Sequence, residues 1–228
     1  MEINTVYNSN SRRSESSIQI QENHWCSVIL GRSIEHQKVS DQGLRDCIRE
    51  KAKQEDYRGA ITLLNQLINR HPNSAIDYNN RGLMYCKQGD CLRAIEDFEQ
   101  AISLNPYLDK AYNNRGNCYA YLGDLVKALE DYEISLELNP YNQRAWINKG
   151  ITLRELEWHD LALETFTLCL VIGKFFQGRI YGERGYTYYL RGDWNCATAD
   201  YRRALSKLLT GDPYVSKVKR RLSKLLNF

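Results

Sequence analysis

The sequence predicts an all-α fold in which helical hairpins stack side by side into a solenoid, and three observations lead to it. First, Pro72, Pro106 and Pro140 lie 34 residues apart. Second, the eighth position of three successive blocks is glycine, at Gly82, Gly116 and Gly150. Third, position 20 is alanine and position 24 is large, in the pairs Ala94 and Phe98, Ala128 and Tyr132, and Ala162 and Phe166. A fixed period of this length is typical of helical repeats, which usually offer a binding surface rather than a catalytic pocket.

The two central blocks, residues 75–108 and 109–142, carry the fullest pattern. Their small residues at positions 8 and 20 allow two helices to approach closely, and alanine also favours the helix. A Gly-Asp pair, such as Gly89-Asp90, gives a left-handed stop followed by a side-chain acceptor for the next helix. Each block then ends at Leu-Asn-Pro, because proline cannot continue a helix. Each block is therefore expected to form a helix–turn–helix.

Three weaker blocks flank the central pair. Residues 41–74 keep Pro72 but carry Ile48 where glycine is expected. Residues 143–177 carry Glu157 in place of the loop glycine and Lys174 in place of the proline. After one extra residue, residues 178–211 restore the pattern. We therefore expect about five repeats over residues 41–211.

These blocks resemble the tetratricopeptide repeat (TPR) family, whose small, large and proline positions they match one by one. The resemblance is to TPR proteins of the kind abundant in bacteria and cyanobacteria. It implies a right-handed superhelix that is not an enzyme and that binds a partner protein on its concave surface. Some bacterial TPR proteins are assembly factors for photosynthetic or other multiprotein complexes, so that role is a further expectation.

The two ends of the chain differ from the repeats. Residues 1–40 are expected to be largely disordered or to form an irregular N-terminal cap, since residues 8–17 are polar without apolar periodicity. Residues 212–228 are expected to form a C-terminal capping helix over residues 214–227. A polar-backed helix of this kind covers the last repeat of a solenoid. An alternative is contact with a nucleic acid or an anionic membrane through its basic residues, Lys217, Lys219, Arg220, Arg221 and Lys224.

Composition gives no sign of a metal, cofactor or catalytic site. The seven cysteines include no Cys-x-x-Cys pair, and the four histidines are scattered. An odd cysteine count without a pairing pattern favours a reducing compartment, so we expect a cytoplasmic protein. No phosphate loop or nucleophile elbow is present, and no apolar run is long enough for a membrane span. We expect no cofactor.

Asparagine occupies position 6 of three successive repeats, at Asn80, Asn114 and Asn148. A side-chain amide both donates and accepts, so it can bond the backbone of an extended peptide without recognising its side chains. The column resembles the asparagine ladder in the TPR superhelix of O-linked N-acetylglucosamine transferases. The alternative is that asparagine merely suits this exposed helical column.

The predicted groove is basic, whereas residues 41–213 as a whole carry net negative charge. This balance favours an acidic partner segment or a chain terminus. RNA binding is the alternative from another class, because some helical repeats recognise RNA. A column of basic residues at position 7 either bridges to neighbouring helices or widens the basic stripe; it comprises Arg81, Arg115, Lys149 and Arg184. The predicted groove residues are Asn79, Asn80, Asn113, Asn114, Asn117, Asn148, Arg45, Arg49, Lys87, Lys110, Tyr121, Arg144, Arg154 and Arg179.

Overall fold

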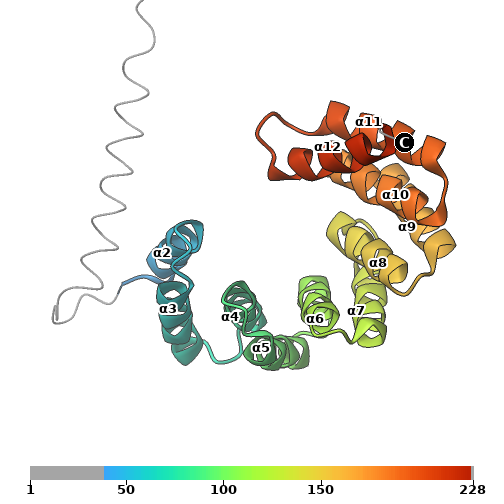
Figure 1. The fold of residues 1–228 in the computed structure, drawn as a ribbon. Helices are drawn as coiled ribbons and strands as arrows, with labels where there is room; N and C mark the ends of the chain where they lie inside the picture. Colours follow the sequence, from blue (N-terminus) through green and yellow to red (C-terminus); the bar gives the residue numbers. More distant parts are fainter. Residues whose placement is uncertain (1–38, 227–228) are drawn as a thin grey trace, which may run out of the picture. The chain divides into compact units, whose positions relative to one another are not determined.

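The structure is a computed structural model that describes residues 39–226 (Figure 1). The predictions for residues 1–38 and for the last two residues lie outside the described residues. Throughout the described part, the only regular secondary structure is helical. The chain forms two compact units, which meet in sequence between Arg70 and His71.

In residues 39–70, the described part of the first unit, the chain forms one helical hairpin, made of α2 (Asp41–Lys53) and α3 (Tyr57–Arg70). Ser40 caps the N-terminus of α2, because its hydroxyl accepts a hydrogen bond from the Gly43 amide. The two helices pack through apolar residues that solvent does not reach, among them Leu44, Ala60 and Leu67. Position 8, where Ile48 replaces glycine, is also buried, so this hairpin accommodates a side chain at that position.

The second unit contains four further hairpins and a final helix. In each hairpin the first helix packs on the second, and the first helices of successive hairpins also contact one another. The hairpins are α4 (Ala75–Lys87) with α5 (Cys91–Leu104), α6 (Asp109–Tyr121) with α7 (Leu125–Leu138), α8 (Gln143–Glu155) with α9 (His159–Ile172), and α10 (Gln177–Arg191) with α11 (Trp194–Lys207). The final helix is α12 (Pro213–Leu226). The predicted all-α fold class is confirmed.

The glycine column has the close-packing role that its position predicts. A Cβ added at Gly116 would lie 2.8 Å from Cε1 of the Tyr132 ring and 3.1 Å from the Ala128 carbonyl oxygen. The large residues at position 24 fill the centre of each hairpin and are at most 1% exposed; they are Phe98, Tyr132, Phe166 and Tyr201. The small and large columns therefore pack against each other directly.

The turns within the hairpins explain the Gly-Asp pairs. Gly89, Gly123 and Gly192 all have a left-handed backbone, with φ between 85° and 90°. Asp90 and Asp124 then cap the following helices, because their carboxylates accept hydrogen bonds from the Arg93 and Lys127 amides. Where glutamate replaces the glycine, at Glu157, the backbone keeps the same left-handed form with φ 64°. The turn geometry is thus retained without its glycine.

Helix α12 begins at Pro213, one residue before its predicted start. It buries Val218 against Ala197, Tyr201 and Ala204 of α11, while Leu222 and Leu225 pack around this cluster. The helix therefore covers the apolar end of the last hairpin. Of the helices in residues 39–226, none is long and apolar enough to cross a membrane.

Candidate partner-binding face

The first helices of the second unit are joined by a continuous chain of side-chain amides. The Asn148 amide on α8 donates to the Asn113 oxygen on α6 at 3.1 Å. The Asn113 amide donates to the neighbouring Asn114 oxygen at 3.3 Å. The Asn114 amide then donates to the Asn79 oxygen on α4 at 3.0 Å. We call these four asparagines the amide chain.

The amide chain divides the predicted asparagines into two kinds. Asn79 and Asn113, at position 5, are each only 6% exposed. Asn114 and Asn148, at position 6, are half-buried, as is Asn80 on α4. An amide has two N–H groups and an oxygen with two lone pairs, so one internal bond of each kind leaves capacity for a ligand. The position-5 residues are thus buried, whereas the position-6 residues are partly accessible to solvent.

The first helices α4, α6, α8 and α10 also carry charged residues that are exposed to solvent. Lys87, Lys110, Arg144 and Arg179 are exposed, against one exposed carboxylate, Glu155. Arg144 also lies over the Phe176 ring, with 5.6 Å between the guanidinium carbon and the ring centroid. We call the exposed bases and the amide chain together the first-helix face. Its exposed charges are mainly basic.

Arg154 does not lie on an exposed surface, although the sequence placed it among the groove residues. Its side chain is 8% exposed and its Nη1 lies 2.8 Å from the Glu183 carboxylate, which is 3% exposed. Because both side chains are buried, neither charge is accessible to a partner. Arg154 therefore serves the contact between α8 and α10.

The remaining predicted residues lie apart from the amide chain or beside it. Arg45 and Arg49 belong to α2 in the first unit, where Arg49 pairs with Asp46. On α6, the exposed Asn117 accepts a hydrogen bond from the Tyr132 hydroxyl at 2.9 Å. Tyr121, at the end of α6, is 75% exposed. The structure thus brings together residues of α4, α6 and α8, whereas α2 belongs to the other unit.

The sequence left open whether the basic residues at position 7 bridge to neighbouring helices or widen the basic stripe. In the structure they form ion pairs with neighbouring helices. Arg81, Arg115 and Arg184 each make two hydrogen bonds to an aspartate sixteen residues later, at 2.6–3.0 Å. These aspartates, Asp97, Asp131 and Asp200, are at most 5% exposed. The hydrogen bonds to Asp131 raise the pKa of Arg115. The three arginines therefore fasten α4, α6 and α10 to the second helix of the same hairpin and do not widen the basic surface.

Lys149 is the exception in this column. The residue sixteen positions later is Thr165, so no carboxylate is available at the matching place. The Lys149 ammonium instead lies 2.9 Å from Glu133 on α7, whose side chain is 55% exposed. This pair links two repeats rather than two helices of one repeat.

A buried charged cluster at the C-terminal end was not predicted. Glu183 accepts a hydrogen bond from the Tyr214 hydroxyl at 2.7 Å, in addition to the Arg154 pair. Arg221 and Lys217 of α12 lie 3.9 and 3.7 Å from the same carboxylate. Burial works against the charged form, but Arg154, the Tyr214 hydroxyl and the two other cations together lower the pKa of Glu183. One signal of this cluster was present in the sequence, since an acid replaces asparagine at position 6.

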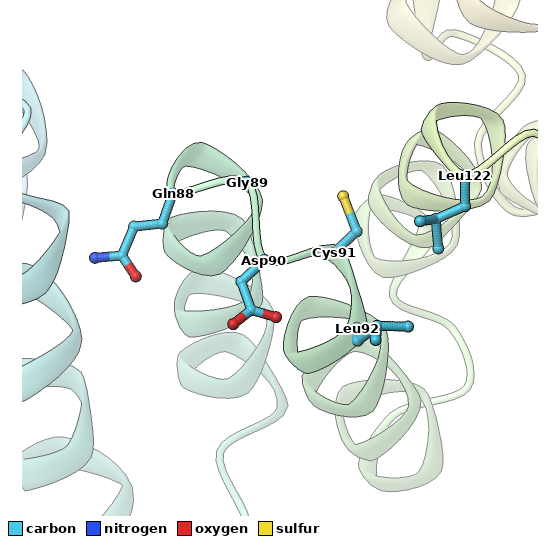
Figure 2. A pocket seen from close by; sticks show the side chains of 6 residues that line it. All are labelled: Gln88, Gly89, Asp90, Cys91, Leu92 and Leu122. Carbon is cyan, nitrogen blue, oxygen red and sulfur yellow. The ribbon is translucent and has the colours of Figure 1, made fainter.

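An open depression lies elsewhere, at the turn between α4 and α5 (Figure 2). It is lined by Gln88, Gly89, Asp90, Cys91 and Leu92, with Leu122 from the end of α6. Its residues bring no paired acid and base together. Among residues 39–226, moreover, no cluster of three histidine, cysteine or carboxylate side chains could hold a metal ion.

A stack of helical hairpins with small residues at the contacts and a capping helix defines a helical-repeat binding protein. Family models agree with this class. Two models described as tetratricopeptide repeat match residues 109–142 and 50–74, and one described as TPR repeat matches residues 82–123. Residues 50–74 and 82–142 therefore match tetratricopeptide repeats, and the other described hairpins are similar to them in fold.

Solved structures of other proteins share the fold. PilW, titled a widely conserved type IV pilus biogenesis factor, aligns with a TM-score of 0.71 and 21% identity over 82% of this chain and 88% of its own. TTC0263, a thermophilic TPR protein of Thermus thermophilus, aligns with 0.68 and 18% over 83% of this chain and 100% of its own. MamA of Desulfovibrio magneticus aligns with 0.64 and 16% over 76% of this chain and 98% of its own. A search of curated proteins gives no match to this sequence.

Proposed function

We propose that this protein is an interaction scaffold whose first-helix face binds an extended, acidic segment of a partner protein. The observation that carries the proposal is the amide chain across α4, α6 and α8, with exposed bases on the same helices. A scaffold of this kind fits a cytoplasmic role in assembling a multiprotein complex, which we include in the proposal.

The amide chain supports recognition of a peptide backbone. Each of Asn114 and Asn148 uses one N–H in the chain and keeps a second N–H for a carbonyl of the ligand. Since the internal bonds already hold the amides in place, little side-chain entropy is lost when a ligand binds. The spacing of one such amide per repeat suits an extended chain rather than a compact surface.

The exposed bases support the acidic character of the ligand. Lys110 and Arg144 belong to the same two helices as Asn114 and Asn148. Charges exposed to water act mainly on association and on the choice of partner, and salt weakens their effect. Nucleic acid remains the alternative, but two of the five basic residues of α12, Lys217 and Arg221, lie close to Glu183 within the protein. This arrangement leaves α12 a less basic surface than its sequence indicates.

The proposal is tested with labelled peptides in extended form, one rich in glutamate and one in which glutamine replaces every glutamate. Fluorescence anisotropy should show tighter binding of the acidic peptide, and the difference should shrink as salt is added. Asn114→Ala and Asn148→Ala should each weaken binding by about 0.5–1.5 kcal/mol, as expected for one hydrogen bond. Lys110→Glu with Arg144→Glu should weaken binding more at low salt than at high salt.

The control is a charge reversal on exposed residues of the second helices, Glu96→Lys with Glu130→Lys. This variant should bind the acidic peptide at least as well as the wild type. If it loses the peptide while the asparagine variants keep it, the binding surface lies on the second helices and the proposal is wrong. A generic RNA that binds more tightly than both peptides would favour the nucleic-acid alternative. A pull-down from the native host, compared between wild type and Asn148→Ala, then identifies the partner.

A further inference from the structure

Two cysteines from neighbouring repeats face each other inside the second unit. Cys86 lies near the end of α4 and Cys118 lies on α6, and their sulfur atoms are 2.8 Å apart. Cys118 is 1% exposed, whereas Cys86 is only partly buried. Cys91, at the start of α5, belongs to the same packed cluster as Cys118, together with Phe98.

The surroundings of the two thiols differ in a way that separates their roles. The contact with the Cys118 sulfur lowers the pKa of Cys86, with a smaller contribution from Lys87. The same contact raises the pKa of Cys118, and burial raises it further. The thiolate is the form that attacks an oxidant. Cys86, which is also the more accessible of the two, is therefore the sulfur that reacts first.

We propose that Cys86 and Cys118 form a disulfide when the protein meets a hydroperoxide. The Cys86 thiolate attacks one oxygen of the peroxide, so that an S–O bond forms, the O–O bond breaks and, after proton transfer, water or an alcohol leaves. The Cys118 sulfur then attacks the sulfenic sulfur of Cys86. An S–S bond forms, the S–O bond breaks, and the Cys118 proton leaves with the hydroxide as water. The two cysteines lose two electrons and the hydroperoxide gains two.

Such a bond would connect the helices that carry the amide chain. Helix α4 holds Asn79 and helix α6 holds Asn114, which are the two ends of one link of that chain. Since a disulfide sets the separation of the two residues that it joins within narrow limits, the oxidised protein has a fixed spacing between these helices. The proposed disulfide rests on the distance between the two sulfur atoms and on their surroundings, and it does not depend on the proposed ligand.

The test uses the full chain, reduced, freed of reductant and treated with hydrogen peroxide before the remaining thiols are alkylated. Trypsin cleavage after lysine and arginine places each cysteine of the sequence in a different peptide. Mass spectrometry should therefore show a cross-link between peptide 82–87, with Cys86, and peptide 116–127, with Cys118. Dithiothreitol should release both peptides.

Three variants make the result specific. Cys86→Ser should abolish the cross-link, while Cys91→Ser and Cys196→Ser should keep it; Cys196 is the exposed cysteine on α11 and serves as the control. A cross-link from Cys118 to Cys91, in peptide 88–93, would overturn the assignment. So would oxidation of Cys86 to the sulfinic acid without any cross-link. Because the peptide map is made first on the wild-type chain, the test does not depend on any variant folding.

Discussion

At the scale of single residues, the basic residues at position 7 form different ion pairs depending on the residue sixteen positions later. Arg115 bonds to Asp131 within its repeat, whereas Lys149 has Thr165 at the matching place and pairs with Glu133 of the preceding repeat. The two cations are similarly exposed, at 19% and 21%, but the Asp131 side chain is only 4% exposed and the Glu133 side chain is 55% exposed. Loss of the buried carboxylate should therefore lower the free energy of unfolding more than loss of the exposed one.

Asp131→Asn is expected to destabilise the protein strongly. The carboxylate is 4% exposed and makes two hydrogen bonds to Arg115, so its loss leaves a largely buried guanidinium without a counter-charge. The free energy of unfolding, measured with urea, should fall by about 3 kcal/mol. The matched control is Glu133→Gln on the same helix, which breaks the exposed Lys149 pair and should cost about 0–1 kcal/mol. Equal losses in the two variants would contradict the difference in burial.

Gly116→Leu tests the close approach of α6 and α7. The first carbon of any side chain there would already lie 2.8 Å from the Tyr132 ring, and Tyr132 is 1% exposed. Overpacking should lower the free energy of unfolding by about 1–3 kcal/mol or more. Tyr121→Leu on the exposed end of the same helix should change it by no more than about 0.5 kcal/mol. A melting temperature that stays unchanged in Gly116→Leu argues against this helix contact.

The candidate site contains features that the sequence predicted and features that it did not. The sequence identified the position-6 asparagines, because their spacing follows the repeat period. It did not show that Asn114 and Asn148 bond to asparagines of the preceding repeat, since that depends on the distance between helices. The sequence also placed Arg154 on an open surface. Its partner Glu183 lies 29 residues away, so the contact that buries Arg154 could not be inferred from the sequence. Asn114→Ala and Asn148→Ala should therefore cost more stability than a change at a fully exposed position.

At the scale of elements, α12 is held on the last hairpin by polar contacts as well as by apolar packing. Its Tyr214 ring lies against Gly182 on α10, where an added Cβ would approach the ring to 2.6 Å. The Tyr214 hydroxyl and Arg221 then reach Glu183. The sequence predicted the apolar face of this helix from its periodicity. It did not predict the Glu183 contacts, because one acidic residue at a repeat position does not indicate which side chains lie next to it in the fold.

The Glu183 cluster predicts a pH dependence of stability. The folded protein lowers the pKa of Glu183 from its usual value of 4.5, so the unfolded chain binds a proton more readily. The stabilising contribution is therefore complete above about pH 4.5 and is lost as the pH falls through the lower folded value. Glu183→Gln should be less stable than wild type at about pH 7, and the difference should shrink toward about pH 3.5. Urea unfolding across this range measures both.

The control for this experiment is Glu155→Gln, which changes an exposed carboxylate on α8. It should alter the free energy of unfolding by no more than about 0.5 kcal/mol at every pH. If the gap between Glu183→Gln and wild type stays constant as the solution is acidified, then Glu183 is not held in its charged form by the folded protein.

At the scale of the whole molecule, the sequence predicted the fold class because the repeat period reports the packing directly. Small and large residues recur at the places where helices touch, as at Gly116 and Tyr132. It did not predict a division of the described residues into two units after Arg70, since the 34-residue pattern continues across this point. Contacts in a solenoid form mainly between neighbouring repeats, so stability can differ from one segment to the next. The proposed division of the chain into an N-terminal segment, repeats and a cap stays a prediction.

The two units lead to a prediction about truncation. Residues 71–228 contain four hairpins, the amide chain and the capping helix, and every ion pair described for α4 to α12 lies among them. Because each repeat needs only its neighbours, this fragment should fold alone and unfold cooperatively. Circular dichroism should show a helical fragment with one thermal transition, and tryptic digestion should leave its core intact. A fragment of residues 39–70, which is a single hairpin, has too few repeats for a stable stack and should be largely unfolded. A folded 39–70 fragment beside an unfolded 71–228 fragment would reverse this assignment of stability.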